Sequence, residues 1–242
     1  MLHRGEADFR QVRAVLDGSC DPANPGEPAV ALPPRTALVS NRRMPPSRPS
    51  PGRDGSHLDA IVRSAAALFA RQGYRGTSMR DLGKAVGVHA GSLYVHIESK
   101  EDLLEKIVHS IMERSERDME EVLATSGTAA EQLREIAARD LHLISENKEA
   151  ATVFFHEWRN LSAQRQAAVI ASRDRWEAGL RTVIAKGIAA GEFREVDVRV
   201  ASIAVSSMLN WVYQWYSPEG DLSPDELADR FADLLVVGLR AS

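Results

Sequence analysis

The residue types that most often carry catalysis or bind metals are few in this chain, and their spacing is unfavourable. There is one cysteine, Cys20, and none of the seven histidines forms an HxxxH or HExxH pair. A single cysteine permits neither a disulfide within the chain nor a cysteine-based zinc site. We see no nucleophile–base spacing and no cofactor-binding loop. The sequence therefore predicts no catalytic residue, no metal and no cofactor; in a rival interpretation as an enzyme, acid–base chemistry would fall to His142, His156 and Glu157.

The most specific pattern lies in residues 73–100, GYRGTSMRDLGKAVGVHAGSLYVHIESK. It predicts two short helices joined by a turn at Gly87, with polar residues opening the second helix. The apolar positions that should be buried are Met79, Leu82, Val86, Val88 and Leu93. A helix-turn-helix requires this arrangement, because its second helix enters the major groove of DNA and presents its first turn to the base edges. By composition alone, a plain helical hairpin would be the commoner explanation.

Residues 58–105 resemble the DNA-binding domain of the TetR/AcrR family of regulators. The shared features are the Gly-Tyr pair, a Thr-Ser cap, an Ala/Gly-x-x-x-Gly-Val turn and the run Leu-Tyr-x-His-Phe-x-Ser-Lys-Glu, in which Ile97 replaces the usual Phe. Beyond residue 105 only the number and length of the helices carry over. The resemblance implies an all-α homodimer in which three N-terminal helices bind double-stranded DNA and the remaining helices bind a ligand and dimerise.

The resemblance also implies roles for individual residues of this segment. Contacts with DNA phosphates are implied for Thr77, Ser78, Tyr94, His96 and Lys100. The residues placed at the base-facing start of the recognition helix are His89, Ala90, Gly91 and Ser92. His89 stands where Ser or Thr is common, so it either contacts guanine or faces solvent, and Lys84 is interpreted as an exposed charge.

The spacing of apolar residues from residue 57 onward is helical, and only Pro218 and Pro224 of the eleven prolines lie there. This predicts an all-α protein of about nine helices. We expect them at residues 58–73, 78–86, 89–95, 100–124, 128–147, 148–158, 162–190, 197–216 and 223–239. Several starts carry capping residues, among them Ser99 and the Thr128–Glu131 capping box.

The C-terminal half is rich in aromatic side chains and carries polar residues on otherwise apolar helices. Such crowding is more often core or dimer interface than ligand site, but some of these groups could converge on a ligand in an apolar pocket. The candidate ligand-binding residues are Phe155, Trp158, Arg159, Arg173, Trp176, Trp211 and Trp215. Residues 211–223 are similar to a segment of TetR-type regulators of fatty-acid and sterol catabolism. This similarity implies an acyl-CoA effector, with Arg159 or Arg173 holding its phosphates; an unrelated hydrophobic or aromatic ligand is the alternative.

The last two helices are expected to pair across a twofold axis as a four-helix bundle. The predicted contact stripe consists of Leu227, Phe231, Leu234, Leu235 and Gly238. Such a homodimer would occupy a pseudo-palindromic operator as a repressor and leave it when the effector binds.

The composition predicts three parts: a disordered Pro- and Arg-rich extension at 1–56, the DNA-binding domain at 57–104 and the ligand-binding and dimerisation domain at 105–242. The net charge of −4 is concentrated in residues 106–242, which hold 16 basic and 22 acidic residues. Contact with DNA must therefore be local. The apolar stretches are too short to cross a bilayer and the N-terminus lacks a signal-like apolar segment, so we expect a cytoplasmic protein without membrane contact.

Overall fold

The computed structural model describes residues 54–95 and 97–240, and this part of the chain is all-α, as predicted. The predicted extension therefore lies outside the described residues up to residue 53. The chain divides into residues 1–54 and 55–242, and every contact reported below lies within the second unit. None of the described helices is both long and apolar enough to span a membrane.

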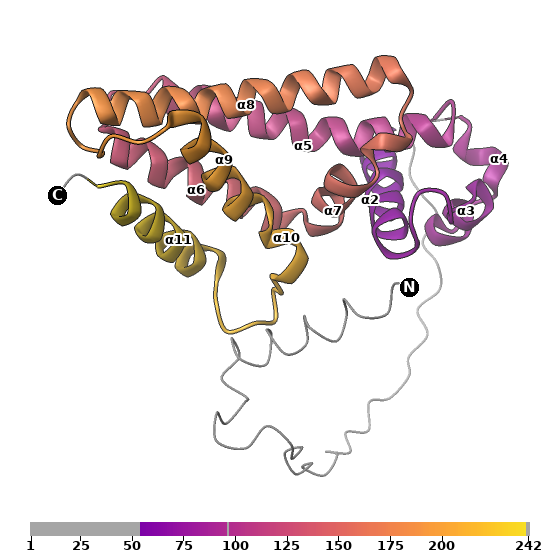
Figure 1. The fold of residues 1–242 in the computed structure, drawn as a ribbon. Helices are drawn as coiled ribbons and strands as arrows, with labels where there is room; N and C mark the ends of the chain where they lie inside the picture. Colours follow the sequence, from indigo (N-terminus) through magenta and orange to yellow (C-terminus); the bar gives the residue numbers. More distant parts are fainter. Residues whose placement is uncertain (1–53, 96, 241–242) are drawn as a thin grey trace, which may run out of the picture. The chain divides into compact units, whose positions relative to one another are not determined.

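Four helices come first: α2 (Asp54–Gln72), α3 (Met79–Val86), α4 (Ala90–Leu93) and α5 (Lys100–Leu123). They are followed by α6 (Ala129–Glu146), α7 (Lys148–His156), the 3-10 turn η1 (Trp158–Asn160), α8 (Ala163–Ala189), α9 (Val198–Asn210), α10 (Val212–Trp215) and α11 (Pro224–Leu239). Figure 1 shows α5 and α8 lying side by side, with α2, α3 and α4 at the end where α5 begins and α11 packed against α6 toward the other end.

Side-chain caps determine where several helices begin. Three starts are capping boxes in which the cap hydroxyl and the carboxylate three residues later satisfy each other's backbone N–H groups: Ser78–Asp81, Thr128–Glu131 and Ser223–Glu226. Ser99 caps α5 by accepting the N–H of Asp102. At the end of α3, Gly87 adopts φ 78°, a left-handed conformation that a residue with a Cβ rarely takes. The helix boundaries are therefore largely local properties of the sequence.

Two apolar cores are joined by α5. The first half of α5 buries Leu103, Leu104 and Ile107 among α2, α3, α4 and α7. The second half buries Met119 and Val122 among α6, α8, α9 and α11. One continuous helix therefore connects the core of the N-terminal head, which we define as α2, α3, α4 and the start of α5, to the core of the C-terminal helices. A displacement of α5 would move both.

The predicted helix at 197–216 is interrupted at Trp211, which separates α9 from α10. The Gln214 N–H bonds to the Trp211 carbonyl three residues back, at 3.1 Å, instead of continuing the α-helical ladder. The break places Tyr213 and Tyr216 in the core, while Trp211 stays 49% exposed. Tyr213 stacks on Phe155 with ring centroids 4.6 Å apart. Packing of these rings, which helical periodicity does not encode, accompanies the interruption.

Other predicted boundaries differ by a few residues. Helix α2 begins at Asp54, so residues 54–56, which are predicted to belong to the extension, are helical. The third predicted helix is shorter, spanning Ala90–Leu93, and the predicted helix at 148–158 ends at His156 before η1.

Candidate nucleic-acid interface and ligand cavity

The α3–turn–α4 segment has the geometry of a helix-turn-helix. Leu82 of α3 and Leu93 of α4 are fully buried and attach both helices to the head core. After Gly87, the Val88 N–H returns to the Gly83 carbonyl at 2.9 Å and closes the turn. This places the start of α4 at the surface.

Most of the residues predicted to face DNA bases are exposed at this surface. His89, Gly91 and Ser92 are exposed, and a Cβ built at Gly91 would meet no atom within 4 Å. The bulk of neighbouring side chains therefore does not require a glycine at this position. The Ala90 side chain falls outside the described atoms. The exposed start of α4 leaves room for the backbone to approach an external partner closely.

The residues predicted to contact phosphate divide into two groups. Tyr94 is 54% exposed and Ser78 is exposed at the N-terminus of α3, whereas His96 lies outside the described residues. Thr77 differs from the expectation, because its side chain is buried and its hydroxyl donates to the Gly73 carbonyl at 2.9 Å. The Thr77 hydroxyl is therefore engaged within the head.

Lys100 also differs from the expectation. Its Nζ donates to the backbone carbonyls of Tyr74 and Thr77, at 2.9 and 2.8 Å, and lies 4.2 Å from the centroid of the Tyr74 ring. An ammonium group bonded to two carbonyls and packed over an aromatic face is not free to bind phosphate in this conformation. In this structure Lys100 joins the start of α5 to the α2–α3 turn.

A cavity of about 450 Å³ lies among the C-terminal helices. It brings together Phe155, Arg173, Trp176 and Trp211 of the candidate ligand residues. Trp158 and Arg159 do not line it, but Trp158 stacks against Arg173. Trp215 instead packs near Phe231, with ring centroids 6.1 Å apart. The size is typical of small-molecule sites.

Arg173 is the cation in the wall of this cavity; the carboxylate Glu177, which also lines it, is paired with Arg181. Its guanidinium carbon lies 5.1, 5.8 and 5.2 Å from the ring centroids of Phe154, Phe155 and Trp158. Burial lowers its pKa, and the nearby positive charge of Arg159 lowers it further. Within residues 54–95 and 97–240 we find no carboxylate paired with Arg173. Aromatic faces stabilise a cation only partly, so this guanidinium is suited to bind an anion that enters the cavity.

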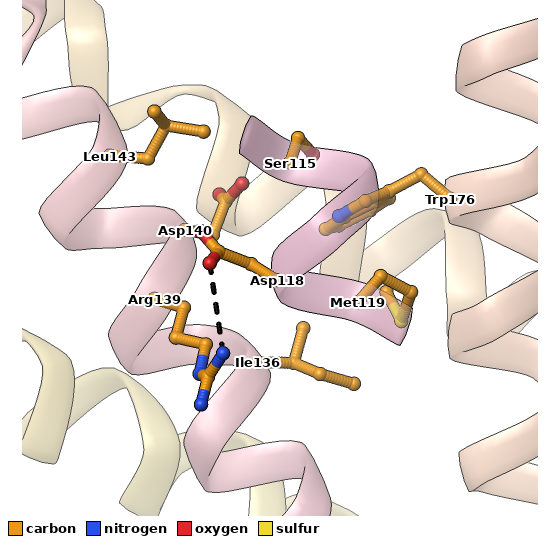
Figure 2. A pocket seen from close by; sticks show the side chains of 8 residues that line it. All are labelled: Ser115, Asp118, Met119, Ile136, Arg139, Asp140, Leu143 and Trp176. Atoms are coloured by element: carbon orange, nitrogen blue, oxygen red, sulfur yellow. Dashed lines mark ion pairs between the residues drawn. The ribbon is translucent and has the colours of Figure 1, made fainter. Parts of the chain in front are cut away.

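The sequence analysis missed Asp140, a carboxyl group in the same wall. Burial raises the pKa of Asp140 to about 7, and the negative charge of Asp118 adds to the effect. Figure 2 shows Asp140 of α6 close to Ser115 and Asp118 of α5, with the Trp176 ring of α8 on the other side. A signal was present in the sequence, because Asp140 lies four residues from both Ile136 and Ile144 on the core-facing side of an amphipathic helix.

A polar junction connects the cavity side of the molecule with the N-terminal head. Arg75, in the α2–α3 turn, donates from Nε to the Asn160 Oδ1 at the end of η1, at 2.9 Å. The Ser162 N–H, just after η1, donates to Glu101 Oε1 at the start of α5, at 2.8 Å. Because η1 also contains Trp158, which stacks on Arg173, few side chains separate the cavity from the head.

The three residues of the enzymatic interpretation have separate partners. His142 pairs with Asp225 at 2.7 Å, whereas His156 lies 3.0 Å from the Tyr213 hydroxyl. Glu157 accepts a hydrogen bond from Asn160 at 2.7 Å. The structure does not bring these three groups together around one reacting centre.

The predicted dimer stripe faces in two directions. Leu227 and Leu235 are buried within the protomer, because α11 packs on α6. Phe231 is half-buried, whereas Leu234 is 65% exposed and Gly238 is exposed. These apolar side chains are exposed on α9 and α11: Val200, Ile203, Leu234 and Val237. Leu227 and Leu235 therefore serve the core of one protomer.

Two family models match the chain. Residues 61–107 match bacterial regulatory proteins of the tetR family, and residues 126–239 match the tetracyclin repressor-like C-terminal domain. The HTH-type transcriptional repressor KstR2 of Mycolicibacterium smegmatis is 25% identical over 196 residues, which are 80% of this chain and 95% of that protein.

Solved structures are similar over the same extent. PfmR, a TetR family transcriptional regulator from Thermus thermophilus, matches with a TM-score of 0.69 and 35% identity, covering 75% of this chain and 99% of that one. AibR in complex with isovaleryl coenzyme A and operator DNA matches with a TM-score of 0.67 and 27% identity, covering 74% and 98%. The helix-turn-helix, the helical C-terminal part and both family models lead to one conclusion: the chain belongs to the TetR family of bacterial transcriptional regulators.

Proposed function

We propose that this protein is a homodimeric repressor that occupies a pseudo-palindromic operator and leaves it when an apolar, anionic small molecule fills the cavity. An acyl-CoA thioester is the leading effector. The observation that carries the proposal is Arg173, a cation in the cavity wall that contacts three aromatic rings and has no paired carboxylate among the described residues. The similarity to AibR, whose structure contains isovaleryl coenzyme A and operator DNA, supports it.

DNA recognition is assigned to the exposed start of α4. His89 and Ser92 are placed to reach base edges, and Tyr94 is placed to contact the phosphate backbone. Gly91 permits close approach of the backbone. Base contacts specify sequence and phosphate contacts set position, so these two groups of residues should have different effects on binding.

Dimerisation is assigned to the exposed apolar side chains of α9 and α11. Val200, Leu234 and Val237 are each more than 60% exposed in the protomer. A second copy of the chain would cover them and hold two recognition helices at a defined separation. Half-sites lie about 34 to 36 Å apart, or at multiples of this distance, so a small change in dimer geometry prevents simultaneous binding of both.

The effector acts by binding better to the conformation that does not fit DNA. A change at Arg173 can reach the head by two routes, through α5 and through η1. A differential affinity of a few kcal/mol is enough to empty the operator, however tightly the ligand binds overall.

The test uses the full-length protein, DNA from upstream of its own gene and a panel of acyl-CoA thioesters, free fatty acids and aromatic drugs. We expect thioesters to raise the melting temperature and to release DNA over the same concentration range. Arg173→Met should abolish both effects and retain DNA binding.

Arg175→Met is the matched control, because Arg175 lies on the same helix but is 58% exposed and paired with Glu116. Release by aromatic drugs alone would reject the acyl-CoA assignment and retain the repressor. A lack of binding to any DNA would reject the repressor itself, and hydrolysis of the thioesters would favour the enzymatic alternative.

A further inference from the structure

Asp140 is an ionisable side chain that lines two cavities among the C-terminal helices. It lines the 450 Å³ cavity and also a neighbouring cavity of about 10 Å³, roughly the space of one water molecule. Its Oδ2 atom is buried and has no hydrogen-bond partner among the described residues. A buried oxygen with no protein partner is available for a hydrogen bond with a ligand that reaches it.

Among the residues that the structure describes, no cation pairs with Asp140. Its neighbour Arg139 points to other acids, with hydrogen bonds from Nε to Glu135 at 2.6 Å and from Nη1 to Glu121 at 2.5 Å. Arg139 also pairs with Asp118 at 3.6 Å, as Figure 2 shows. Burial and the charge of Asp118 raise the pKa of the Asp140 carboxyl to about 7, so the neutral form is well populated near neutral pH. A neutral carboxyl group can donate one hydrogen bond and accept another.

Arg173 and Asp140 are two of several polar side chains in the cavity lining, which also includes Glu177 and Asn210. Arg173, on α8, contacts the rings of Phe154, Phe155 and Trp158. Asp140, on α6, lines the smaller cavity together with Trp176, which follows Arg173 on α8. The lining also includes the apolar side chains of Met112 and Leu143. A ligand that spans the cavity would thus meet a cation, an apolar wall and a hydrogen-bonding carboxyl group.

We propose that Asp140 is a specificity-determining residue of the effector cavity and recognises a hydroxyl or keto oxygen on the carbon skeleton of an apolar, anionic effector. The inference rests on the proposed function, since it takes the cavity as the effector site and Arg173 as its anion-binding group. The terminal torsion of an aspartate is soft, so rotation about it can turn the unpartnered oxygen toward a ligand in the cavity. A site built to hydrogen-bond a ligand oxygen discriminates against the analogue that lacks it.

The experiment measures calorimetric binding of matched probes to the full-length protein. The probes are derivatives of hexanoate, octanoate and decanoate. Each chain length is prepared in four forms: unsubstituted (plain), ω-hydroxy, (ω−1)-keto, which is a methyl ketone, and ω-amino. Every form is made both as the free acid and as the CoA thioester. In at least one chain length, we expect a hydroxy or keto probe to bind about three- to tenfold tighter than its plain counterpart. The ω-amino probe should bind more weakly than the hydroxy probe.

Three variants assign the preference to one side chain. Asp140→Leu should remove the preference for the oxygen-bearing probe, whereas Asp140→Asn, which is similar in shape and keeps a hydrogen-bonding group, should retain part of it. Ser207→Ala is the matched control, because Ser207 also lines the cavity but its hydroxyl already donates to the Ile203 carbonyl at 2.7 Å. Circular dichroism establishes that each variant is folded.

The outcomes separate the two proposals. Equal binding of plain and oxygen-bearing probes at every chain length, with binding still dependent on Arg173, would overturn the role of Asp140 and leave the proposed function standing. Tightest binding of the ω-amino probe would also overturn it, because the carboxyl group would then act as an anion. No binding and no operator release by any probe would reject the anionic acyl effector and this inference with it.

Discussion

The Nε atom of Arg75 donates a hydrogen bond to the Oδ1 atom of Asn160 across 85 positions of the chain, at 2.9 Å. Arg75 belongs to the α2–α3 turn of the N-terminal head, whereas Asn160 ends the 3-10 turn that contains Trp158 and Arg159. Both Arg159 and Arg173 stack on Trp158, with guanidinium carbons 4.7 and 5.2 Å from its ring. An anion that draws Arg173 away from Trp158 would therefore disturb the segment that contacts the head.

We predict that Asn160→Ala weakens the communication between effector and operator. The side chain contacts neither the cavity nor the recognition helix, so the Kd of each ligand alone should change by no more than about twofold. The effect of effector on DNA affinity, which is about 5- to 150-fold in allosteric proteins, should fall toward one.

Fluorescence anisotropy with and without effector measures this ratio. Gln166→Ala is the control, because Gln166 holds the same turn through the carbonyls of Arg159 and Leu161 without reaching the head. A double-mutant cycle with Arg75→Ala isolates the direct contact. An unchanged ratio in Asn160→Ala would leave α5 as the route of coupling.

Lys100→Met should reduce the stability of the head without changing the salt dependence of DNA binding. The Lys100 ammonium holds two backbone carbonyls, and hydrogen bonds to charged groups contribute about 1.5 to 3 kcal/mol. Thermal unfolding measures the first effect. The slope of log K against log salt measures the second, and a decrease of about one per contact would return Lys100 to the phosphate interface.

The exposed residues of α4 should separate affinity from specificity. His89→Ala and Ser92→Ala should change the preferred base at defined operator positions, by about 1 to 3 kcal/mol for each lost base contact. Tyr94→Phe should weaken binding to specific and random DNA alike. Selection from randomised operators is the measurement, and His109→Ala, an exposed histidine on α5, is the control. Profiles identical to the wild type would remove α4 from the major groove.

The exposed apolar face should carry the dimer contact. Leu234→Glu combined with Val237→Glu is expected to yield monomers that lose a two-half-site operator, because buried unpaired carboxylates are costly. Ile170→Glu controls for the addition of charge, since Ile170 is 48% exposed on α8. Leu235→Ala should instead lower the free energy of unfolding by about 2 to 5 kcal/mol, because it opens a cavity in the protomer core. Sedimentation at micromolar protein concentration measures the oligomeric state of each variant. Dimers that persist in the double glutamate variant would place the interface elsewhere.

The partly buried carboxyl group of Asp140 should make stability fall as pH rises. Its pKa is raised to about 7 in the folded protein, above the value near 3.9 of an unfolded chain. Between these two values the folded state binds more protons than the unfolded state, so the free energy of unfolding decreases with pH, and the penalty is complete above pH 7. Asp140→Asn should therefore gain stability relative to the wild type between about pH 4 and 7. Urea unfolding over this range is the measurement, and a constant difference between the two proteins would contradict the buried ionisation.

The sequence was sufficient to predict the features that depend on local chemistry. The caps at Ser99 and Thr128, the turn at Gly87 and the exposed start of α4 follow from hydrogen bonding and backbone conformation within a few residues. The all-α class follows because helical periodicity continues to the end of the chain. The same locality makes the helix-turn-helix recognisable from the order of its residues alone.

Only the tertiary structure determined the relations between groups that are far apart in the sequence. A lysine at the start of a helix looks available for phosphate until Lys100 is found bonded to carbonyls 23 and 26 positions away. Leu227 and Leu234 share one apolar helix, yet only packing against α6 determines which of them remains at the surface. The raised pKa of Asp140 likewise arises because the packing of α5, α6 and α8 buries part of its carboxyl group and places Asp118 nearby. Burial and long-range charge depend on how helices pack, and periodicity along one helix carries no information about its neighbours.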